Sequence, residues 1–167
     1  MLEIRTYPEP VLRRRTQPVQ RIDRKLLTLV SDMLETMYAE DGIGLAAPQI
    51  GESIRLCVLN VTGDADGELV LINPVVVDQS EAEVAEEEGC LSLPGVRADV
   101  LRPVRVKVNA YDQRGQEINI DAGGLESRCL QHEIDHLDGR MFIDRLNHAK
   151  QMLLRPQLKQ LEKEFAG

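Results

Sequence analysis

The chain has 167 residues, of which 43% are hydrophobic, and a formal net charge of −8, which together predict a single domain over residues 1–167. No apolar run approaches the roughly 20 residues of a membrane span, and the first residues lack the order of a signal peptide, which argues against a membrane or secreted protein. The acidic balance also argues against a nucleic-acid substrate, because phosphate backbones are bound by clustered lysine and arginine.

The first forty residues predict an irregular segment followed by a helix. Residues 1–22 contain scattered prolines and read as an extended lead-in that wraps the domain. From Asp23, a good N-cap, apolar residues recur at helical spacing as far as Asp41 and Gly42. This pattern predicts an amphipathic helix that packs one face against the core.

Residues 42–49, Gly-Ile-Gly-Leu-Ala-Ala-Pro-Gln, follow this helix. Two glycines two positions apart suggest a backbone that another group approaches closely, but a phosphate-binding loop matches poorly. From the residues alone, a tight turn is the favoured interpretation. Gln49 reads either as a buried core amide, which is favoured at this point, or as a hydrogen-bond donor to an oxyanion.

The middle of the chain predicts strands. Residues 54–61 read as a buried strand, and residues 69–72 and 75–77 read as strands that Asn73-Pro74 separates. The acidic run 81–88 is expected in solvent. Apolar and polar residues alternate over 104–110, which predicts a half-buried strand joined by a hairpin turn to residues 116–120.

The pattern H-E-x-x-H occurs at His132-Glu133-Ile134-Asp135-His136, within a helix that Gly123-Gly124 and Gly139 delimit. Histidines at i and i+4 leave the same face of a helix, so His132 and His136 can bind one metal ion. Glu133 beside them is placed to act as general base for a water molecule that the metal holds.

A metal site needs at least one further protein ligand. Cys129 lies seven residues before His136, about 10 Å along the helix axis, which is too far for ligands of one ion. Cys90 follows a glycine outside any clean strand, whereas Cys57 lies within an apolar run and reads as a core residue. Cys90 is therefore the best candidate for the third ligand.

The ends of the chain are basic although the whole is acidic. Residues 1–25 carry a charge of +4 and residues 140–167 a charge of +3, so the middle carries −15. Asn147 is expected to cap a last helix, a C-terminal extension over 148–167 that Pro156 should kink or split. Its basic surface is either a solvated face or a docking segment for an anionic partner. Three cysteines without framework spacing indicate reduced thiols, and hence a cytoplasmic protein.

Three segments, Gly42–Gln49, Glu88–Ser92 and Gln131–His136, together resemble the three signature motifs of peptide deformylases in order and spacing. The resemblance implies an α+β fold in which antiparallel strands pack around a central metal-binding helix, with an N-terminal and a C-terminal helix outside. It also implies a bacterial-type hydrolase that removes the N-formyl group from formyl-methionine on nascent polypeptides and releases formate. A ribosome-docking role for the basic C-terminal helix is a further expectation.

The same resemblance implies roles for individual residues. Cys90, His132 and His136 would bind a divalent metal. A soft thiolate suits iron(II) or zinc(II), and the resemblance favours iron(II), with zinc(II) or another transition metal as the alternative. Glu133 would be the general acid and base, and Gln49 and the backbone N–H of Leu91 the oxyanion hole. Peptide-binding positions are implied at Ile43, Gly44, Leu45, Gly89, Arg97, Leu125 and Cys129.

Two details of this resemblance concern charged side chains. Arg128 departs from the usual apolar residue beside the methionine pocket, and we expect its long side chain to reach the rim with its charge in solvent. Glu88 is a candidate to orient a metal-binding histidine.

Two other classes of protein fit the H-E-x-x-H helix. A zinc metallopeptidase would need a glutamate ligand downstream, and Glu162 and Glu164 lie on the C-terminal segment. A binding protein with a structural metal would need a closed site of four ligands, whereas the chain offers three ligands and a base.

Overall fold

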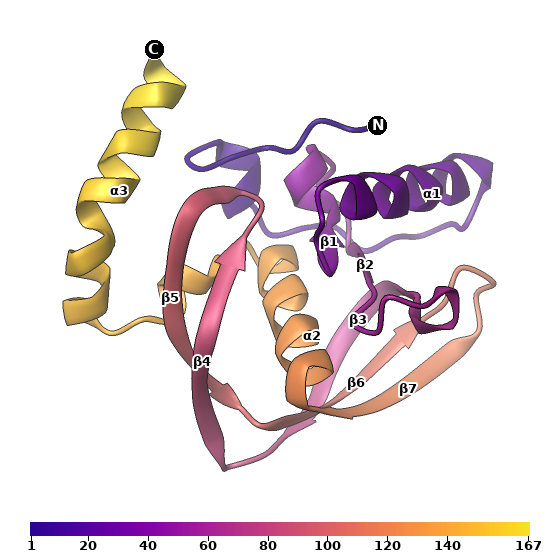
Figure 1. Cartoon of the computed structure of the whole chain (residues 1–167). Helices are drawn as coiled ribbons and strands as arrows, with labels where there is room; N and C mark the ends of the chain where they lie inside the picture. The colour runs from indigo at the N-terminus through magenta and orange to yellow at the C-terminus, as the bar shows by residue number, and fades with distance from the viewer.

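The computed structural model describes residues 1–167 and contains three α-helices and seven strands (Figure 1). Five strands form one antiparallel sheet in the order β1-β2-β3-β6-β7, and β4 and β5 form a separate two-stranded ribbon. The bounds are α1 Arg24–Ala39, β1 Gly44–Ala46, β2 Leu56–Leu59, β3 Leu69–Gln79, β4 Glu83–Cys90, β5 Leu93–Pro103, β6 Arg105–Tyr111, β7 Glu117–Gly123, α2 Gly124–Leu137 and α3 His148–Ala166.

Helix α1 begins where the sequence predicts. The side chain of Asp23 accepts a hydrogen bond from the backbone N–H of Leu26 at 2.9 Å, which caps the first turn. The buried residues Val30, Met33 and Met37 lie on one stripe of the helix and pack against the sheet.

Strand β2 is buried on both faces, which explains its continuous apolar sequence. Leu56 and Val58 belong to the core that α1 covers, whereas Cys57 and Leu59 belong to the core that α2 covers. The alternation of side chains along a strand therefore divides the interior into two layers at this point.

Helix α2 lies between the five-stranded sheet and the β4–β5 ribbon (Figure 1). Every residue from Ser127 to Leu137 is buried, including the charged ones. Leu130, Ile134 and Leu137 pack against the sheet, which leaves the polar residues of the helix to face the ribbon and the site. The expected α+β architecture around a central helix is confirmed.

Two strand predictions need correction. Asn73 does not separate two strands, because β3 is continuous and absorbs Asn73-Pro74 as a bulge. Asn73 has φ 53°, and its side-chain amide bonds both the N–H and the carbonyl of Val19. The expected turn at residues 42–49 contains the short edge strand β1, followed by a 3-10 turn over Ala47–Ile50.

The acidic run 81–88 is not simply a solvated segment. Most of it forms β4, where the side chains of Glu83, Glu86 and Glu87 are exposed but that of Glu88 is buried. Its partner β5 was not predicted, because its apolar positions are interrupted by Pro94, Gly95 and charged residues. The ribbon curves around α2 and closes the site from the side opposite the sheet (Figure 1).

Helix α3 lies at the edge of the molecule and packs through Leu154, Leu158 and Leu161 (Figure 1). Asn147 caps it by accepting a hydrogen bond from the N–H of Lys150, as predicted. Pro156 does not split the helix, which is continuous to Ala166. Because Pro156 is on the exposed side, the carbonyl that it leaves unpaired can be hydrated. No helix of the protein has the length and apolar character needed to cross a membrane.

Candidate metal centre

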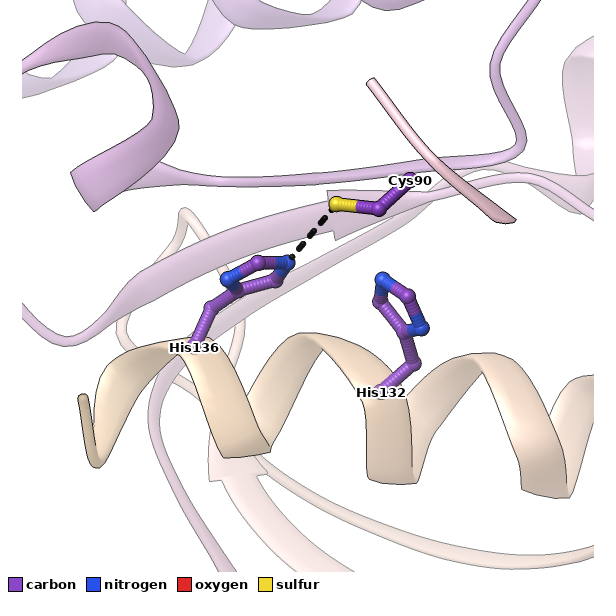
Figure 2. Close-up of side chains that lie close together, drawn as sticks. All are labelled: Cys90, His132 and His136. Carbon is purple, nitrogen blue, oxygen red and sulfur yellow. Dashed lines mark hydrogen bonds between the residues drawn. The ribbon is translucent and has the colours of Figure 1, made fainter. Parts of the chain in front are cut away.

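Three potential metal ligands lie close together in the structure. Two of them, His132 and His136, are in the C-terminal half of α2, and the third is Cys90 at the end of β4. One potential ligand atom from each residue lies within 4.8 Å of the others. The thiol Sγ of Cys90 is 3.3 Å from Nε2 of His136, and both histidine rings rise from the same side of the helix toward the cysteine (Figure 2). Donor atoms around a single transition-metal ion are about 3–4 Å apart, so this group has the composition and spacing of a metal site.

Cys90 reaches the helix because of an irregularity in the ribbon. It is the last residue of β4, and the register of β4 with β5 shifts between Gly89 and Cys90. A shift of this kind turns a side chain away from the direction that strict alternation would give. The ribbon therefore supplies the third member of this group, which α2 cannot provide by itself.

Glu88 orients His132. Its Oε1 lies 2.8 Å from Nδ1 of His132, so that ring nitrogen is engaged and Nε2 is left to face the cluster. Arg102 donates to both oxygens of Glu88, at 2.5 and 2.9 Å. Burial by itself would raise the pKa of Glu88, but the hydrogen bonds from His132 and Arg102 lower it to about 2. Glu88 is therefore a fixed anion, which is the property required of a group that orients a histidine.

Arg102 also connects this carboxylate to the far side of α2. Its Nη1 donates a hydrogen bond to Oδ2 of Asp135 at 2.9 Å. The Asp135 carboxylate also accepts hydrogen bonds from Nη2 and Nε of Arg145, at 2.6 and 3.1 Å. Arg102 and Asp135 are both buried, so each charge is compensated within the protein. The network joins the ribbon, the helix and the segment that follows the helix.

Arg128 does not reach the rim, contrary to the prediction. The residue is only 6% exposed, and its guanidinium faces the ribbon. Nη1 lies 2.6 Å from Oε2 of Glu88 and 2.8 Å from the carbonyl of Val100, and Nη2 lies 2.8 Å from the carbonyl of Val84. These three acceptors, of which the Glu88 carboxylate and the Val100 carbonyl are buried, hold the charge inside the protein, which explains the difference.

Glu133 lies beside the cluster of Cys90, His132 and His136, in a buried pocket. The residue is 4% exposed, and Oε1 of its carboxylate has no hydrogen-bond partner within the protein. Burial raises the pKa of Glu133 to about 7, although the charge of His132 acts in the opposite direction. Gly44 makes room for this group, because a Cβ there would lie 2.6 Å from Oε2 of Glu133 and 2.9 Å from Sγ of Cys129.

Gln49 is buried, and its amide orientation is fixed from both ends. Its Oε1 accepts a hydrogen bond from the N–H of Ala46 at 2.9 Å, and its Nε2 donates to Oγ of Ser92 at 3.1 Å. Nε2 is also 3.5 Å from Sγ of Cys90, so the donor end of the amide faces the cluster. Gln49 is therefore a buried core amide whose donor end faces the cluster, and its role as an oxyanion donor stays a prediction.

A cavity of about 460 Å³ opens on the cluster. Eleven of the residues predicted for the site line it: Ile43, Gly44, Gln49, Gly89, Cys90, Leu91, Arg97, Leu125, Cys129, His132 and Glu133. Two do not. His136 belongs to the cluster but is fully buried. The side chain of Leu45 is buried in the core that α1 covers, so only its backbone can belong to the β1 edge. Arg97 is exposed and forms an ion pair with Glu87 at 2.9 Å.

Sequence reasoning missed Arg102, Asp135 and Ser92. A signal for Arg102 exists, because Val96, Val100 and Arg102 share one face of an alternating strand, and a buried valine face predicts that the arginine is buried too. Asp135 lies one turn from His132 on a helix whose residues are nearly all buried. Ser92 carries no such signal, since its contact with Gln49 depends on the turn between β4 and β5.

Sequence comparison shows that the chain is similar to peptide deformylases. The family model described as polypeptide deformylase matches residues 1–152. The peptide deformylase of Syntrophobacter fumaroxidans is 46% identical over 98% of this chain and 97% of its own length. The rice chloroplastic peptide deformylase 1B is 43% identical over 98% of this chain, which spans 62% of that longer protein.

Solved structures agree with the sequence relatives. A peptide deformylase from Plasmodium falciparum superposes with a TM-score of 0.94 at 38% identity, covering 98% of this chain and 97% of that one. One from Legionella pneumophila gives a TM-score of 0.91 at 42% identity, covering 99% and 98%. The similarity therefore extends over almost the whole fold.

Proposed function

The chain belongs to the polypeptide deformylase family, and we propose how its own residues carry the activity of that family. As a peptide deformylase, the enzyme is a metal-dependent hydrolase that removes the N-formyl group from nascent peptides. The released product is formate, and the first residue recognised is formyl-methionine. The observation that carries this proposal is the cluster of half-buried Cys90 with His132 and His136, beside which Glu133 has an unpaired oxygen.

The donor set fits a divalent transition metal. One thiolate and two imidazoles are soft and borderline ligands, which suit iron(II) or zinc(II) rather than magnesium or calcium. Three protein ligands leave a coordination position open, as catalytic sites require. When bound there, such an ion lowers the pKa of water so that hydroxide is available near neutral pH. We propose iron(II) as the metal, with zinc(II) as the alternative.

Glu133 is proposed as the proton carrier. A formamide is a poor electrophile and its amine a poor leaving group, so the reaction needs one proton taken from water and one given to nitrogen. A carboxylate whose pKa is about 7 can do both near neutral pH. Glu133 lines the cavity where a substrate would lie, and its Oε1 has no hydrogen-bond partner within the protein.

Gln49 and the backbone N–H of Leu91 are proposed to stabilise the negative charge that develops on the formyl oxygen. The fixed orientation of the Gln49 amide supports this role, because its donor end faces Cys90 before any substrate arrives. Loss of one such donor typically raises the barrier by about 3–4 kcal/mol.

The substrate backbone is proposed to lie along the open edge of β1. That strand pairs with β2 on one side only, so its other edge is available to a peptide that adds as a further strand. Ile43, Leu125 and Cys129 supply apolar surface for a methionine side chain. Arg97, at the mouth of the cavity, is proposed to contact the peptide beyond the methionine.

A zinc peptidase is not favoured. Its third ligand would be a downstream glutamate, but Glu162 and Glu164 lie on α3, where Glu162 instead accepts a hydrogen bond from the hydroxyl of Tyr7 at 2.6 Å. The third member of the metal-binding group is Cys90.

Formyl-Met, acetyl-Met and unblocked peptides of the same sequence should separate these activities. We expect formate from the first and no hydrolysis of the other two, because the cavity must accept the small formyl group next to Glu133. Formate is measured with a coupled dehydrogenase, and internal cleavage by mass spectrometry. Cleavage within the unblocked peptide would favour the peptidase instead.

Helix α3 is proposed to dock on an anionic partner, the ribosome where nascent chains emerge. Arg155, Lys159 and Lys163 are exposed and spaced by four residues, so they form a positive stripe along one side of the helix. Leu154 on the same helix is buried against the domain. A complete deletion of α3 would therefore expose core residues, and a loss of ribosome binding could not be attributed to the charges.

The reduced cysteines and the nascent-chain substrate support action in the cytoplasm, which stays a prediction.

Changing Arg155, Lys159 and Lys163 together to Glu is expected to abolish co-sedimentation with ribosomes while leaving turnover of a free formyl-Met peptide within about twofold. The reason is that the stripe lies outside the cavity and its charge attracts ribosomal phosphates. Arg114→Glu, a single exposed change in the β6–β7 turn, is the control. Unchanged sedimentation of the triple variant at low and moderate salt would refute docking through this stripe.

A further inference from the structure

Arg128 makes more contacts across the site than any role at a pocket rim requires. It lies on α2 four residues before His132, about one turn, so both side chains leave the same face of the helix. Its guanidinium bonds a carboxylate oxygen of Glu88 at 2.6 Å and the backbone carbonyls of Val84 and Val100 at 2.8 Å each. Val84 belongs to β4 and Val100 to β5, so the Arg128 side chain forms hydrogen bonds with the backbone of both ribbon strands.

These contacts cross the boundary between the two elements that carry the metal ligands. Cys90 is at the end of β4, whereas His132 and His136 are on α2. The distance between the cysteine and the histidines is therefore set by how the ribbon sits on the helix. A planar guanidinium with several donors in a rigid fork fixes such a geometry more tightly than an apolar contact.

Arg128 also acts on His132 through Glu88. Oε2 of Glu88 accepts from Arg128 and from Nε of Arg102, whereas Oε1 accepts from Nη2 of Arg102 and faces Nδ1 of His132. Arg102 holds the carboxylate from the ribbon side, and Arg128 holds it from the helix side. With both present, rotation of the carboxylate is blocked, and so is rotation of the imidazole bonded to it.

We infer that Arg128 is a positioning residue that fixes the β4–β5 ribbon and the Glu88 carboxylate relative to α2, and so keeps the three metal ligands arranged for one ion. The inference rests on the proposed metal site. It assigns to this arginine a role that an apolar residue at the same position could not perform, because an apolar side chain cannot bond two carbonyls and a carboxylate.

Arg128→Met tests this with cobalt(II) as the probe, because a cobalt ion bound to a thiolate has visible absorption bands that report its ligands. Methionine keeps the length of the stem and removes every donor. We expect cobalt affinity, measured by competition with a chelator, to fall by roughly 10–100-fold, as for loss of other outer partners of metal ligands. The absorption bands should shift or weaken. Arg128→Lys should lie between Arg128→Met and wild type, since an ammonium lacks the fork.

Two controls separate positioning from general stability. Val30→Ala removes buried volume from α1, far from the ribbon, and should lower the free energy of unfolding without changing the cobalt spectrum. Glu86→Gln removes only the exposed partner of Arg128, at 3.4 Å, and should leave cobalt affinity unchanged.

Wild-type affinity and spectrum in Arg128→Met would overturn the inference while leaving the metal site intact. Failure of the wild-type protein to bind cobalt would instead refute the metal site itself. If Arg128→Met does not fold, Arg128→Lys decides, because wild-type affinity in that variant would mean that the bonds to both strands are not needed.

Discussion

Glu133→Gln is expected to retain its metal and to lose turnover of a formyl-Met peptide by roughly 10²–10⁴-fold, or more because the group acts twice. Glutamine has the shape of the glutamate but cannot accept a proton. Glu133 is not among the three residues whose donor atoms form the cluster, so its neutralisation leaves the ligands in place. In the structure, Oε1 of Glu133 has no hydrogen-bond partner within the protein that the substitution would disrupt.

The measurement is metal stoichiometry beside turnover for the purified variant. His132→Ala is the matched contrast, because it removes a ligand and should lose the metal and the activity together. Peptide binding to Glu133→Gln should persist, since the apolar surface of Ile43, Leu125 and Cys129 is untouched. A metal-free Glu133→Gln protein, or one with near-normal turnover, would show that Glu133 is not simply a proton carrier.

Cys90→Ser is expected to lose metal more severely than the roughly 10–100-fold that loss of an outer partner causes. A serine hydroxyl stays protonated near neutral pH and is a harder ligand than a thiolate. The replaced sulfur lies 3.3 Å from Nε2 of His136, at the centre of the cluster. Activity should fall in parallel with the metal content, and excess metal should restore part of it.

Cys57→Ser is the control for this change. Cys57 is fully buried within β2, and burial raises the pKa of its thiol well above the ordinary value. A hydroxyl placed there should lower the free energy of unfolding by about 1–3 kcal/mol, with the metal retained. Metal analysis after gel filtration, together with urea unfolding, distinguishes the two variants. Equal metal retention by Cys90→Ser and wild type would remove Cys90 from the site.

Local patterns in the sequence predict much of this fold. The cap at Asp23, the apolar run of β2 and the alternation in β6 are each decided by residues close in sequence, and the structure agrees with them. The spacing of His132 and His136 is equally local. Cys90 could be identified only because its surroundings differ from those of Cys57, and the resemblance to a family supplied the remaining roles.

The ribbon and its charges could not be predicted in the same way. Four glutamates in β4 look like a solvated run, and only pairing with β5 gives Glu88 a buried position beside two arginines. The placement of Arg128 depends on carbonyls of Val84 and Val100, which lie 44 and 28 residues away in sequence. Periodicity describes which side of an element a residue occupies, but it does not describe which distant acceptors will meet it there.

The central position of α2 determines when the fold can be completed while the chain is being synthesised. All seven strands precede α2 in the chain, and the core on its side of the sheet is completed by Leu130, Ile134 and Leu137. An isolated helix of 14 residues is marginal in water, so α2 gains its stability from strands made earlier. Until residues 124–137 have left the ribosome, the core between the sheet and the ribbon lacks the side chains of α2. Cys90 also lacks His132 and His136, which α2 carries. Each new copy therefore brings Cys90, His132 and His136 together only after residues 124–137 have been synthesised.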